Sequence, residues 1–149
     1  MSRVLMLAAG AAGAAALLFA GVAPAQADTA PVTTCNNWHL QDGHNTPLCV
    51  TVSGTSVSLT GQIALAGPPS PGTPWPPAPE QTSTTLSADV VGGGNLGTAQ
   101  QNVVFQASTL TIGPLNVTAA CGTTVHASFS ISTYPWFNTP TTVDVPINC

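Results

Sequence analysis

Hydrophobic and polar residues alternate along most of the chain with a period of two. The run Val-Thr-Val-Ser at residues 50–53 is one example, and the pattern returns in later segments. Successive side chains of a β-strand point to opposite faces of a sheet, so this pattern predicts strands that bury one face. The predicted strands are residues 50–53, 57–65, 82–91, 101–112, 115–120, 124–131 and 142–147.

The number and spacing of these strands predict an all-β fold. Turn residues such as Gly54-Thr55 and Gly92-Gly93-Gly94-Asn95 separate about seven short strands. We expect an antiparallel immunoglobulin-like β-sandwich. A closed barrel is the main alternative, because the same alternation fits it equally well. The alternation changes phase near Ser108, which we interpret as a β-bulge inside one long strand.

A proline-rich segment interrupts the strands at residues 67–79. Its sequence, Gly-Pro-Pro-Ser-Pro-Gly-Thr-Pro-Trp-Pro-Pro-Ala-Pro, can neither donate regular ladder hydrogen bonds nor form a helix. We therefore predict a surface loop with an extended polyproline II conformation. Such a loop is either a plain connection or a recognition segment for a partner.

The first 27 residues predict a cleavable signal peptide. Arg3 supplies a positive charge, residues 4–20 form an apolar run, and Ala25-Gln26-Ala27 offers the small side chains that signal peptidase requires. We expect cleavage after Ala27 and a secreted, extracellular product with a single sandwich domain at residues 28–149. The bias toward Ala, Gly and Thr is typical of a bacterial protein from a GC-rich genome.

Four cysteines follow the predicted cleavage site: Cys35, Cys49, Cys121 and Cys149. An even number in a secreted chain predicts two disulfide bonds. Three pairings are open. The most local one joins Cys35 to Cys49 and Cys121 to Cys149, and it is favoured because short loops cost less entropy to close.

The distribution of charge restricts the partners. Arg3 is the only Lys or Arg, so residues 28–149 contain five acids and neither Lys nor Arg, and their formal charge is −5 with neutral His. Binding to nucleic acid or to an anionic membrane surface depends on Lys and Arg. We therefore expect neither nucleic acid nor membrane as a partner.

Few residues suggest a catalytic or metal site. His39, Asp42 and His44 form the best candidate metal site, and His126 can add a third imidazole. The alternative is that these side chains are simply solvated, because their spacing matches no zinc signature. We expect no cofactor and no catalysis, since the nucleophile motif Gly-x-Ser-x-Gly is missing. A small secreted hydrolase is a minor alternative.

Aromatic residues give the best indication of function. Trp38 and Trp75 lie in predicted connections, and Tyr134, Trp136 and Phe137 crowd into a third. Exposed rings contact sugars or partner proteins; alternatively, these rings fold back and cover the ends of the sandwich. We expect a non-catalytic binding or surface-interaction module for a protein or a carbohydrate. The main alternative is a carrier for an apolar small molecule.

Overall fold

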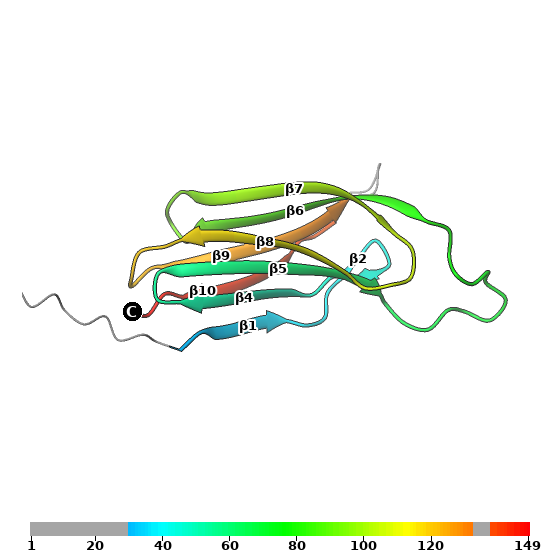
Figure 1. Ribbon diagram of the computed structural model, residues 1–149, viewed down its shortest axis with the longest axis horizontal. Helices are drawn as coiled ribbons and strands as arrows, with labels where there is room; N and C mark the ends of the chain where they lie inside the picture. The colour runs from blue at the N-terminus through cyan, green and yellow to red at the C-terminus, as the bar shows by residue number, and fades with distance from the viewer. Residues whose placement is uncertain (1–29, 133–137) are drawn as a thin grey trace, which may run out of the picture.

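A computed structural model describes residues 30–132 and 138–149, which form two antiparallel sheets, one of them curled into a half-barrel (Figure 1). The predicted all-β class is therefore confirmed. The signal peptide predicted at residues 1–27 lies outside the described residues. The strands are β1 (Val32–Asn36), β2 (Leu40–Gln41), β3 (His44–Asn45), β4 (Leu48–Ser53), β5 (Ser56–Leu65), β6 (Glu80–Val90), β7 (Asn95–Phe105), β8 (Leu110–Thr118), β9 (Thr124–Ser132) and β10 (Thr141–Pro146).

The long strand β5 organises the first sheet, which has the order β1-β4-β5-β3-β2. β4 and β3 pair with successive parts of one edge of β5, and β8 pairs with its other edge. The second sheet has the order β10-β9-β6-β7. The connection between β5 and β6 leaves the first sheet and returns in the second, at the end of the molecule opposite to the C-terminus (Figure 1).

The hairpins were the most predictable elements. β4 and β5 pair up to Ser53 and Ser56, so the turn is the predicted Gly54-Thr55, and Gly54 has a φ of 57°. β6 and β7 form a second hairpin around Gly92–Gly94, as the glycine run indicated. Glycine suits such turns because it has no Cβ to clash at positive φ.

The prediction of one long strand over residues 101–112 is wrong. β7 ends at Phe105 and β8 begins at Leu110, and the four residues between them carry the chain from one sheet to the other. The phase change near Ser108 therefore marks this crossing, not a bulge. In each sheet, the pairing of the strands decides which alternate side chains point to the core. The hydrophobic positions of β8 therefore need not continue the alternation of β7. The predicted break before Leu115 is also wrong, because β8 runs through it.

Three strands at the start of the domain were not predicted. β1 has no buried side chain, and β2 and β3 are two residues long, so none of them shows alternation. β1 is held to β4 by a disulfide between Cys35 and Cys49, which lie directly opposite each other with 4.1 Å between their Cα atoms. The second disulfide joins Cys121 to Cys149. The structure thus has the local pairing.

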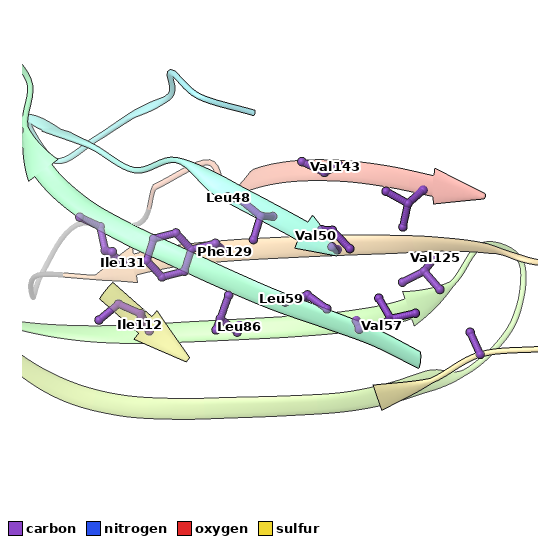
Figure 2. Close-up of a cluster of buried hydrophobic side chains, with 14 of the residues drawn as sticks. Leu48, Val50, Val57, Leu59, Leu86, Ile112, Val125, Phe129, Ile131 and Val143 are labelled. Atoms are coloured by element: carbon purple, nitrogen blue, oxygen red, sulfur yellow. The ribbon is translucent and has the colours of Figure 1, made fainter. Parts of the chain in front are cut away.

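The core fills the space between the two sheets, and Figure 2 shows its side chains pointing inward from both. Leu48, Leu59 and Phe129 are completely buried. Gly61 on β5 lies against the ring of Phe129 on β9: a Cβ on Gly61 would come within 2.7 Å of the ring. Glycine at position 61 therefore leaves the space that the ring of Phe129 occupies.

Candidate functional site

The proline-rich segment forms an arm, which we define as residues 66–79 and which projects from the sheets in Figure 1. The predicted loop is thus confirmed, but it is not extended throughout. Ser70-Pro71-Gly72-Thr73 reverses direction: Thr73 N donates to Ser70 O over 3.1 Å, and Gly72 has a φ of 86°. Proline followed by a positive-φ glycine is the signature of a type II turn.

Trp75 stands on the returning part of this arm and is 57% exposed. Its neighbours form an apolar hollow of about 240 Å³ between the arm and the end of β5. Its apolar lining residues include Leu65, Pro69, Pro74, Trp75 and Pro77. Because prolines fix much of the backbone, the arm presents the indole from a stiff support.

Other exposed hydrophobic side chains lie at the same end of the molecule. Leu40 pairs with Asn45, which pairs with Ala64 beside the base of the arm, and Trp38 lies just before β2. Val104 lies opposite Gln81, where the chain re-enters the sheet from the arm. These places define the arm end of the sandwich.

The arm end holds most of the large hydrophobic side chains that the described residues expose. Trp38, Leu40, Trp75 and Val104 are each more than half exposed, and only Val32 and Val91, at the opposite end, share this property in the described part of the chain. Sequence patterns indicated Trp75, whereas Leu40 and Val104 gave no signal.

A buried polar network fixes the hairpin that carries Leu40. The Gln41 amide nitrogen lies 2.8 Å from Thr46 Oγ1, 3.0 Å from Phe129 O and 3.1 Å from Thr141 Oγ1, and Gln41 Oε1 accepts from Ile131 N over 3.1 Å. Gln41 is 1% exposed. Its side chain therefore joins β2 to β9 and β10, and no sequence signal marked it.

The candidate metal ligands have separate surroundings. His39 Nε2 lies 3.0 Å from the carbonyl oxygen of Thr139; because that oxygen can only accept, the ring nitrogen donates. Asp42, with a φ of 49°, lies in the two-residue turn between β2 and β3. Within the ranges that the structure describes, no three His, Cys, Asp or Glu side chains are grouped to hold a metal ion.

The remaining histidines have carboxylate neighbours. His44 is buried, its ring is edge-on to Phe105 with 4.7 Å between centroids, and its Nε2 is 3.8 Å from Glu80 Oε2. His126 Nδ1 is 2.6 Å from Asp144 Oδ1 on the neighbouring strand. Each of the two thus faces a different carboxylate.

The candidate aromatic cluster Tyr134, Trp136 and Phe137 lies outside the described residues, so its role stays a prediction. Asn138, which follows it, donates from its side chain to Ile131 O over 3.3 Å. The described residues include no helix that is long and apolar enough to cross a membrane.

Comparisons of this chain with protein-family models, with curated proteins and with solved structures gave no significant match. The function is therefore inferred from the geometry of the described residues.

Proposed function

We propose that this chain is a secreted, non-catalytic binding module that contacts its partner with the arm end. The observation that carries the proposal is the gathering of Trp38, Leu40 and Trp75 at one end, with Trp75 raised on a proline-stiffened arm. Tryptophan is enriched at binding hot spots. A stiff support lowers the entropy that is lost on binding.

The composition of the arm end sets the chemistry of the partner. The hollow under Trp75 is built from proline, leucine and glycine with two hydroxyl residues, and the sequence after Arg3 contains no Lys or Arg. A partner with an apolar face, either a protein or the C–H face of a carbohydrate, gains most from contact with such a surface. A nucleic acid or an anionic membrane could form no ion pairs with Lys or Arg on this surface.

Beside Trp75, the size of the hollow favours surface contact over the enclosure of an apolar small molecule. Ligand pockets that enclose a small molecule usually have volumes of roughly 300–1,000 Å³. The hollow measures about 240 Å³. Between the sheets the space is taken by side chains such as Leu48, Leu59 and Phe129, which are completely buried.

We also propose that the sandwich is immunoglobulin-like. In that fold, strands B and C are consecutive, E and F are consecutive, B pairs with E in one sheet and C pairs with F in the other. Here β5 pairs with β8 and β6 pairs with β9, which supports the assignment. β4, β7 and β10 then take the places of A, C′ and G, and β1 is an additional strand.

The test compares Trp75→Ala with Val91→Ala, a truncation of a similarly exposed side chain at the opposite end. We expect retention of the exported protein on cells of the producing organism to fall at least tenfold for Trp75→Ala, because hot-spot truncations cost about 2 kcal/mol or more. Val91→Ala should be retained like the unmodified protein.

Both midpoints of thermal unfolding should stay within about 3 °C of the unmodified protein, because neither side chain is buried. Equal retention of the two variants would contradict the proposal. A loss of retention that accompanies a large fall in the midpoint would assign Trp75 to folding instead.

A further inference from the structure

A second concave surface lies beside the base of the arm, on the outer face of the second sheet. It is a shallow groove of about 370 Å³, formed by the start of β6, the end of β7 and the end of β9. Its lining residues are Gln81, Thr82, Ser83, Asn102, Val103, Val104 and Ser132. Gln81 follows the arm by two residues, so the groove belongs to the arm end.

The register of the strands arranges the groove side chains in a row. Ser83 lies opposite Asn102 on one side and opposite Ser132 on the other, and Gln81 lies opposite Val104. Neighbouring strands are about 4.8 Å apart, so polar groups follow one another at that spacing across the sheet. The alternation of β6 turns Gln81 and Ser83 to the solvent, while Thr82 is buried.

The same outer face continues this pattern beyond the groove. Thr85 lies between Ser130 and Gln100 in the next row. Ser87 lies between Ser128 and Thr98 in the row after that, and the hydroxyl oxygens of Ser87 and Ser128 are 2.8 Å apart. The groove is thus the hollowed end of a wider face of hydroxyl and amide groups.

From this arrangement we propose that the groove binds a neutral oligosaccharide. Hydroxyl and carboxamide groups both donate and accept hydrogen bonds, as sugar hydroxyls do, so the groove offers a ligand hydroxyl both donors and acceptors. None of the lining residues is ionisable, so a charged ligand would lose hydration without gaining an opposite charge. The exposed side chain of Val104 offers an apolar contact for a sugar ring.

This inference deepens the proposed binding function by naming the ligand class, but it uses residues other than Trp75. The chain also supplies a control surface. A wider hollow of about 640 Å³, mainly on the first sheet, also carries hydroxyl groups such as Ser58 and the amide of Asn116, together with apolar side chains such as Val57 and Val117, but it lies away from the arm. If a hydroxyl-rich surface were enough for binding, the oligosaccharide would bind both in the groove and in this wider hollow.

The experiment is an amide NMR titration of the exported protein with cellohexaose, N-acetylchitohexaose and laminarihexaose, with hexagalacturonate as the anionic control. We expect at least one neutral probe to give saturable shifts at Gln81, Ser83 and Asn102. Asn102→Ala should weaken the affinity about fivefold, the worth of one neutral hydrogen bond, and Asn116→Ala should leave it unchanged.

Several outcomes would overturn the inference: no saturable shift with any neutral probe, equal shifts around Asn116, or tighter binding of hexagalacturonate. Saturable shifts confined to the arm would overturn the groove site and leave the proposed function in place. The opposite result is also informative. If the groove binds a neutral probe but the Trp75→Ala variant is retained normally on cells, only the proposed role of the arm is contradicted.

Discussion

Replacing Gly61 with alanine is expected to destabilise the protein by about 2–3 kcal/mol and to lower the midpoint of thermal unfolding by about 10 °C. The new Cβ would lie 2.7 Å from one ring carbon of Phe129 and 2.8 Å from two others. Phe129 is completely buried between the sheets, so the ring cannot move aside without disturbing other core side chains. Denaturant unfolding measures the loss.

A matched control and a rescue make this prediction specific. Gly67→Ala adds the same methyl group where no atom lies within 4 Å, and it should change the stability little. Phe129→Leu alone should cost about 1–2 kcal/mol as a partly filled cavity. Combined with Gly61→Ala it should cost clearly less than the sum of the two single changes, because the smaller side chain relieves the clash. Strict additivity would contradict the account of this contact.

Gln41→Ala is expected to cost about 2–4 kcal/mol, although the residue lies on a strand of only two residues. The change removes the acceptor for Ile131 N and the donor for Phe129 O, and both groups belong to the buried strand β9. A polar group that is buried without a hydrogen-bond partner lowers the stability by its full desolvation free energy, because no hydrogen bond in the protein replaces those lost to water.

The readout for Gln41 is local as well as global. Hydrogen exchange at the Ile131 amide should accelerate more than exchange at the Val125 amide, which lies farther along β9. Gln62→Ala, on the exposed face of β5, is the control and should stay within about 0.5 kcal/mol of the unmodified protein. A Gln41→Ala protein of unchanged stability would show that the network contributes nothing to the fold.

Local patterns in the sequence predicted the parts of the fold that depend on near neighbours. The hairpin at Gly54-Thr55 and the glycine run after β6 are such cases, because turn chemistry and alternation act within a few residues. The arm was predictable for the same reason. The crossing between Phe105 and Leu110 was not, because the phase change near Ser108 fits a bulge within one strand as well as it fits a change of sheet.

The candidate site shows the same division. Trp75 stood out because it is an aromatic residue within a proline-rich segment. The groove could not be predicted, because Ser83, Asn102 and Ser132 meet only through the register of three strands. Near His39, the dipeptide Asp42-Gly43 indicated the turn that the structure has between β2 and β3, whereas the burial of His44 gave no local signal.

Photocrosslinking on living cells tests the role of the arm end most directly. A photoreactive amino acid replaces Ala78, an exposed residue of the arm, or Val91 at the opposite end, and the exported protein is irradiated in its own culture. We predict a defined adduct from position 78 that disappears when Trp75→Ala is added, and no adduct from position 91. Adducts of equal yield from both positions, or an adduct from position 91 alone, would contradict the account.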